Sequence, residues 1–134
     1  IEFGNLDGAR EYRPWRAYAQ SKLANILFTA ELAERLPQPG QTANSLHPGV
    51  IRTGLQRHMG TGFRVVQAVA GPLYLKSIPQ GAATQCLAAA HTWAATLTGR
   101  YLADCNVAEP SSLASDPALA RRLWEETERI VAGF

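Results

Sequence analysis

Residues 14–53 read PWRAYAQSKLANILFTAELAERLPQPGQTANSLHPGVIRT, and their pattern of apolar residues, prolines and glycines indicates the fold class. Pro14 opens a helix at a position where its missing N–H leaves no hydrogen bond unmade. Apolar residues then recur at helical spacing from Trp15 to Leu36, where two prolines and a glycine stop the helix. An extended segment at 41–46 ends at a Pro-Gly turn. The stretch therefore predicts a long helix that leads into a short strand.

The same alternation continues along the rest of the chain. Glycines and a proline interrupt residues 52–77, where one or two short helices are expected. A helix is predicted from Pro79 to residue 90, a second strand at 98–103, and a terminal helix at 116–131 with Asp116 as its N-cap. This order is typical of an α/β fold in which crossover helices join parallel strands. Because two strands do not complete such a sheet, we expect the chain to be part of a larger domain.

The amino-acid composition argues against several classes of protein. Of 134 residues, 46% are hydrophobic and 18% are charged, which is typical of a globular protein. The net charge is +2 with no run of lysines or arginines, so nucleic acid is not an expected partner. No apolar run approaches the about 20 residues that span a bilayer, and no signal peptide is recognisable, so we expect a cytoplasmic protein. Cys86 and Cys105 lack metal-ligand spacing, so we expect no metal and two reduced, partly buried thiols.

Tyr18 and Lys22 stand four residues apart, which places them on one face of the first helix. A free phenol is a poor base at neutral pH, and a neighbouring ammonium favours its ionised form. Tyr18 would then accept a proton from an alcohol while hydride leaves the carbon, or donate one to a ketone. Lys22 has further donors for ribose hydroxyls. The alternative is a core aromatic beside a solvated lysine.

Pro48 and Gly49 follow the first predicted strand at its carboxyl end. In open α/β sheets, ligands bind beyond the carboxyl ends of the strands. Gly49 would let a flat ring approach the backbone closely. The amides of Val50 and Ile51, with the Thr53 hydroxyl, could then bond a carboxamide. The alternative is a turn that does no more than end the strand.

Together these residues resemble a known family. Residues 18–25 (YAQSKLAN) and 44–53 (NSLHPGVIRT) are similar to the short-chain dehydrogenase/reductases, and within them to the retinol dehydrogenase-like branch. Residues 79–82 (PQGA) and the terminal helix extend the similarity over nearly the whole chain. The resemblance implies the C-terminal portion of a Rossmann-type doubly wound parallel sheet with crossover helices. It also implies an NAD(P)-dependent oxidoreductase that interconverts an alcohol and a ketone or aldehyde.

The resemblance carries over to this chain residue by residue. Tyr18 matches the catalytic acid/base, and Lys22 matches the residue that favours its ionisation and holds the nicotinamide ribose. Residues 48–53 match the segment that contacts the nicotinamide carboxamide, and 54–78 match a substrate lid whose apolar residues favour a hydrophobic substrate. The branch favours NADP over NAD, and relatives often form homodimers through the helix of the pair. The implied cofactor-binding residues are Tyr18, Lys22, Pro48, Gly49, Val50, Ile51 and Thr53.

The departures from the family are also informative. The family's glycine-rich phosphate-binding turn and the residue that selects NAD or NADP have no counterpart among these residues. The family's catalytic serine and proton-relay asparagine are expected upstream of Ile1. We therefore expect residues 1–134 to be a single partial domain, the C-terminal half of an enzyme, inactive alone. The alternative is a non-catalytic binding or interaction protein that retains a Rossmann-type fold.

Overall fold

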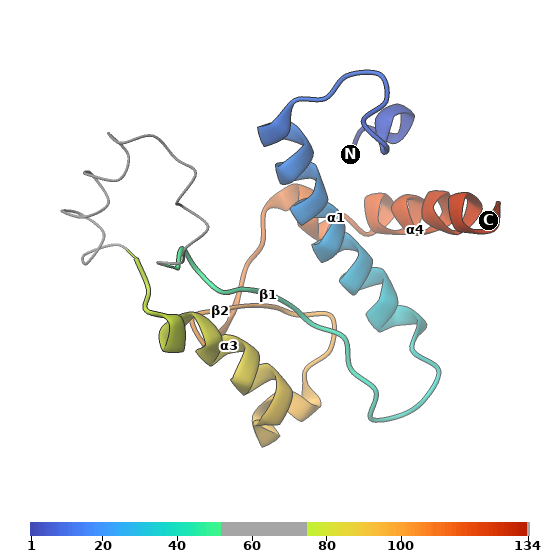
Figure 1. Cartoon of the computed structure of the whole chain (residues 1–134). Coiled ribbons are helices and arrows are strands. Elements are labelled where there is room, and N and C mark those ends of the chain that lie inside the picture. Colours follow the sequence, from blue (N-terminus) through green and yellow to red (C-terminus); the bar gives the residue numbers. More distant parts are fainter. Residues whose placement is uncertain (52–74, 134) are drawn as a thin grey trace, which may run out of the picture.

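The computed structural model describes residues 1–51 and 75–133. Its helices alternate with short strands, which confirms the mixed α/β class (Figure 1). In chain order the elements are η1 (Phe3–Asn5), α1 (Pro14–Arg35), β1 (Ser45–His47), α3 (Ile78–Ala90), η3 (Thr92–Thr96), β2 (Tyr101–Ala103), β3 (Asn106–Ala108), η4 (Ser112–Ser115) and α4 (Pro117–Val131).

Helices α1 and α4 begin as the sequence predicts. Pro14 is the first residue of α1, which ends at Arg35, two residues before Pro37. The carboxylate of Asp116 caps α4 by accepting the N–H groups of Ala118 and Leu119 at 2.9 and 3.1 Å. Both starts are local features. Proline has no N–H that would need a partner in the first turn, and an N-cap carboxylate accepts N–H groups of that turn.

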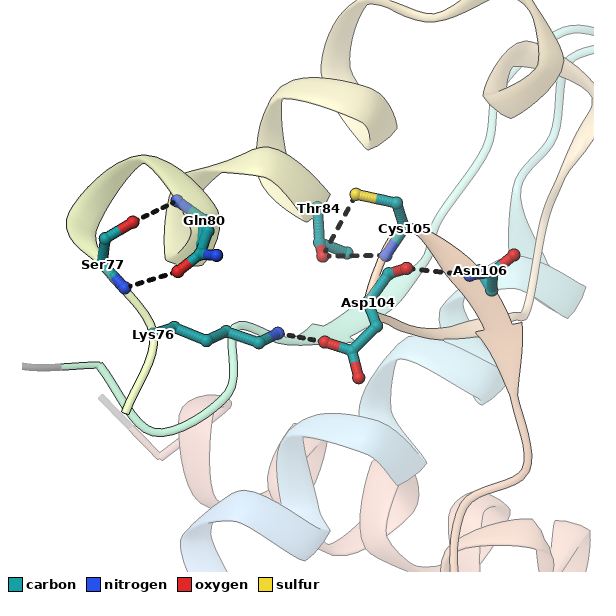
Figure 2. A network of polar contacts seen from close by, with 7 residues as sticks. All are labelled: Lys76, Ser77, Gln80, Thr84, Asp104, Cys105 and Asn106. Atoms are coloured by element: carbon teal, nitrogen blue, oxygen red, sulfur yellow. Dashed lines mark hydrogen bonds and ion pairs between the residues drawn. The ribbon is translucent and has the colours of Figure 1, made fainter. Parts of the chain in front are cut away.

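Helix α3 begins at Ile78, one residue before the predicted start, and its cap was not predicted. The hydroxyl of Ser77 accepts the N–H of Gln80 at 3.4 Å, and the Gln80 side chain accepts the Ser77 N–H at 2.8 Å (Figure 2). This reciprocal pair is a capping box, and the spacing Ser-x-x-Gln in the sequence was its signal.

Strands β1 and β2 pair in parallel, as predicted, but both are shorter than expected. Leu46 lies opposite Leu102, and Ser45 opposite Tyr101. Before these residues, a main-chain hydrogen bond from the Gly99 N–H to the Ala43 carbonyl at 2.7 Å and the side chain of Asn44 join the two segments. The Asn44 amide donates to the Leu97 carbonyl at 2.7 Å, and its oxygen accepts the Arg100 N–H at 3.0 Å. The predicted strands at 41–46 and 98–103 are therefore wrong at their first residues, because side-chain hydrogen bonds of Asn44 and Thr98 interrupt the regular main-chain ladder there.

Strand β3 was not predicted, and it pairs antiparallel with β2. Asp104 and Cys105 connect the two strands with φ values of +51° and +60°. Two consecutive positive φ values are typical of the tight turns of two-residue hairpins. Among residues 1–51 and 75–133, the expected parallel sheet is thus a three-stranded sheet with an antiparallel edge.

The sheet is covered on both faces. Helices α1 and α4 lie on one side of the strands and α3 lies on the other (Figure 1). Leu27 of α1 packs with Ala120 and Leu123 of α4 in the core between these two helices. Phe28 stacks on Trp124 at 5.3 Å between ring centroids, which extends the same contact.

The predicted short helices of 52–77 lie outside the described residues, as does most of the predicted lid at 54–78. The described end of that segment, residues 75–78, leads into α3. Within residues 1–51 and 75–133, no helix is both long and apolar enough to cross a membrane.

A glycine allows α3 to approach the end of β1 closely. Gly81 is buried, and a Cβ on it would stand 2.2 Å from Cδ1 and 2.6 Å from Cγ1 of Ile51. Carbon atoms do not approach one another this closely, so any side chain at position 81 displaces Ile51. The packing of α3 on the chain after β1 therefore depends on this glycine.

We expect Gly81→Ala to lower the free energy of unfolding by about 1–3 kcal/mol, because the added methyl overpacks the contact. Adding Ile51→Val removes Cδ1 and should restore part of the loss. Urea unfolding of the complete gene product measures both effects. Gly4→Ala is the control, since a Cβ there meets only an arginine side chain at 3.5 Å. A Gly81→Ala protein as stable as the wild type would contradict the packing.

Candidate active site

The predicted pair Tyr18 and Lys22 lies on the first half of α1, and the structure brings its two side chains together. The Lys22 Nζ atom lies 5.3 Å from the centroid of the Tyr18 ring, within the range of a cation–π contact. Tyr18 is 58% exposed. The alternative of a core aromatic is therefore wrong for Tyr18, and the exposed Lys22 lies over a ring.

The predicted segment Pro48–Ile51 follows β1 directly. Gly49 has φ +83°, in the left-handed region that glycine enters at no steric cost. The Val50 carbonyl accepts the Lys76 N–H at 2.9 Å, and Ile51 forms a parallel bridge with Lys76. The N–H groups of Val50 and Ile51 donate to no other described residue. The segment thus places two amide N–H groups directly after Gly49, a residue that has no side chain.

The pair and the segment lie toward the same edge of the sheet. Helix α1 runs toward the amino end of β1, and β1 then runs back in the opposite direction (Figure 1). The first half of α1, with Tyr18 and Lys22, is therefore on the side of the carboxyl end of β1, where Pro48 and Gly49 follow. This is the edge at which open α/β sheets bind ligands. Thr53, the last predicted cofactor contact, lies outside the described residues.

Two charged residues that sequence reasoning did not single out also lie at this edge. The Lys76 ammonium forms an ion pair with the Asp104 carboxylate, which belongs to the turn after β2 (Figure 2). The hydrogen bond from Lys76, then its charge, and to a smaller extent the charge of His47 hold the pKa of Asp104 below its usual value. Local signals existed, since lysine occurs only at positions 22 and 76 and Asp favours the positive φ of a tight turn.

Among the described residues no three His, Cys, Asp or Glu side chains lie together as metal ligands. Cys86 and Cys105 are both free thiols, as expected. Cys86, in α3, is exposed rather than partly buried, whereas Gly81 and Thr84 are the buried residues of that helix.

Comparison with known proteins places this geometry in a family. No family model matches the chain. The Brassica napus protein "Short-chain dehydrogenase TIC 32 A, chloroplastic" is 44% identical over 133 residues, 98% of this chain and 41% of the relative. Human retinol dehydrogenase 11 is 41% identical over 93% of this chain and 39% of its own length. Mouse polyprenol dehydrogenase is 42% identical over 97% of this chain and 39% of its own length.

The chain belongs to the short-chain dehydrogenase/reductase family. Among its relatives are several retinol dehydrogenases at 38–41% identity, which confirms the similarity to that branch. The chain spans 39–41% of the length of the curated relatives it matches.

We expect Asp104 to titrate below its usual pKa of 3.8 in the folded protein, and Lys76→Met to raise its pKa toward that value. Because the pKa is lowered on folding, the contribution of the ion pair to stability is complete above about pH 4. It is lost as the pH falls through the lowered pKa. Carboxyl chemical shifts followed against pH measure this, with Arg129→Met on α4 as control. An unshifted Asp104 would disprove the ion pair.

Proposed function

We propose that the protein containing this chain is an NAD(P)-dependent oxidoreductase that interconverts an alcohol and a ketone or aldehyde, with Tyr18 as acid/base. The observation that carries the proposal is the Lys22 ammonium, 5.3 Å from the ring centroid of an exposed tyrosine. The names of its relatives, which are dehydrogenases, support the same reaction class.

The proposed chemistry of this chain is a proton transfer at the Tyr18 hydroxyl. In the direction of oxidation, ionised Tyr18 takes the proton of the substrate hydroxyl, and in the direction of reduction it returns one to the carbonyl oxygen. The positive charge of Lys22 stabilises the phenolate between these events. Exposure of the tyrosine leaves its hydroxyl accessible to a substrate.

A nicotinamide dinucleotide fits the donors at this edge. The N–H groups of Val50 and Ile51 are of the kind that bonds a carboxamide, and Lys22 has donors to spare for ribose hydroxyls. When bound, the dinucleotide supplies or accepts the hydride. NADP is the first dinucleotide to test and NAD the second.

The helices on both faces of the sheet support the proposal that this chain forms the C-terminal portion of a Rossmann-type, doubly wound sheet.

The proposed substrate is a hydrophobic alcohol or carbonyl compound. Two relatives are named for retinol and for polyprenol, and we extend only the apolar character of those alcohols to this chain. Homodimerisation through α1 and a cytoplasmic location stay predictions.

Tyr18→Phe in the complete gene product should lower turnover by about a hundredfold or more, because it removes the group that moves the proton. Dinucleotide affinity should stay within about twofold, since the ring and Lys22 remain. Steady-state kinetics and fluorescence titration with NADPH measure the two. Tyr12→Phe is the matched control, because Tyr12 is a 69% exposed tyrosine that lies two residues before the start of α1. Unchanged turnover in Tyr18→Phe would favour the non-catalytic binding protein.

Lys22→Ala should reduce turnover and dinucleotide affinity together, because one ammonium serves both the phenolate and the ribose. Lys22→Arg retains the charge and should recover part of the affinity. The same kinetic and fluorescence measurements apply. If the affinity of Lys22→Ala equals that of the wild type, the ribose role is wrong.

A further inference from the structure

A polar network joins three separate segments of the chain (Figure 2), and through Lys76 it contacts Gly49 and Val50. Lys76 comes from the segment before α3, Asp104 from the turn between β2 and β3, and Thr84 from α3 itself. We propose that the Lys76–Asp104 ion pair is a positioning device that sets the conformation of the Gly49–Val50 backbone. The inference rests on the proposed function, in which this backbone faces the dinucleotide.

Lys76 holds the backbone by two independent contacts. Its main-chain N–H donates to the Val50 carbonyl at 2.9 Å. Its side chain crosses Gly49, where a Cβ would stand 2.7, 2.8 and 2.9 Å from Cδ, Cε and Nζ. Only a residue without a side chain leaves room for the lysine in this path. The backbone at Gly49 and Val50 is thus hydrogen-bonded by Lys76 and covered by its side chain.

Asp104 is the fixed end of the ion pair. Its backbone lies in the tight turn at φ +51°, and its carbonyl accepts the Asn106 side-chain amide at 2.8 Å. The next residue, Cys105, donates its N–H to the Thr84 hydroxyl at 3.2 Å. Thr84 is only 1% exposed, so the turn is attached to the buried face of α3. The carboxylate therefore has a defined position although its side chain is 72% exposed.

The Lys76–Asp104 ion pair acts on the conformation of the nearby backbone rather than on the stability of the whole fold. An ion pair with one exposed partner contributes little to overall stability. Its effect is concentrated where the lysine chain lies, over Gly49 and against the segment with the donor groups of Val50 and Ile51. Loss of either charge releases the lysine side chain from Gly49. The donors then lose part of their preorganisation, which weakens ligand binding without touching the proton-transfer group.

The test is a double-mutant cycle in the complete gene product, with Lys76→Met and Asp104→Asn. Methionine keeps an aliphatic chain without the charge, and asparagine keeps the shape of the aspartate. Each variant should raise the dissociation constant for NADPH by about two- to fivefold, the range of one partly exposed ion pair. Turnover should stay within about twofold, and the double variant should bind no more weakly than the single variants. Lys76→Arg should bind as the wild type does.

One further measurement tests the positioning role independently of dinucleotide binding. Amide chemical shifts of Gly49 and Val50 should change in Lys76→Met and in Asp104→Asn, and should stay unchanged in Arg129→Met and Glu126→Gln, which break an ion pair on α4. If the wild type binds no dinucleotide, the proposed function fails, and these shifts alone decide the positioning role. Unchanged shifts, additive losses in the cycle, or equal losses in the α4 controls would each overturn the proposal.

Discussion

The parallel pairing of β1 with β2 is the constraint on which the candidate site depends. It joins residues 44 and 100, which are 56 positions apart, through the Asn44 side chain and continues through Leu46 opposite Leu102. Closing so long a loop has an entropic cost that the ladder and its apolar contacts must offset. Because the pairing is parallel, Pro48 after β1 and Asp104 after β2 emerge at the same edge.

Two glycines let other segments approach that edge. Gly81 brings the backbone of α3 against Ile51, and Gly49 leaves the path that the Lys76 side chain occupies. In each case a missing Cβ allows a contact between parts of the chain that are far apart in sequence. The resemblance singled out both glycines by motif, and the packing supplies the physical reason for each.

Helix α1 has one face that packs in the core and another that carries the proposed catalytic pair. Its Leu27 is fully buried against Ala120 and Leu123 of α4, so one face of the helix holds the core. Another face presents Tyr18 to solvent with Lys22 over its ring. Substitutions of the pair should therefore be possible without disturbing the packing between α1 and α4.

Features that depend on neighbouring residues could be predicted from the sequence. Pro14 and Asp116 begin their helices locally, and four-residue spacing places Lys22 beside Tyr18 once a helix forms. The cap at Ser77 was equally local and could have been predicted. The lengths of the strands, the antiparallel β3 and the Lys76–Asp104 ion pair, whose partners are 28 positions apart, depend instead on tertiary contacts. Such contacts follow from sheet register and loop closure, which local periodicity does not encode.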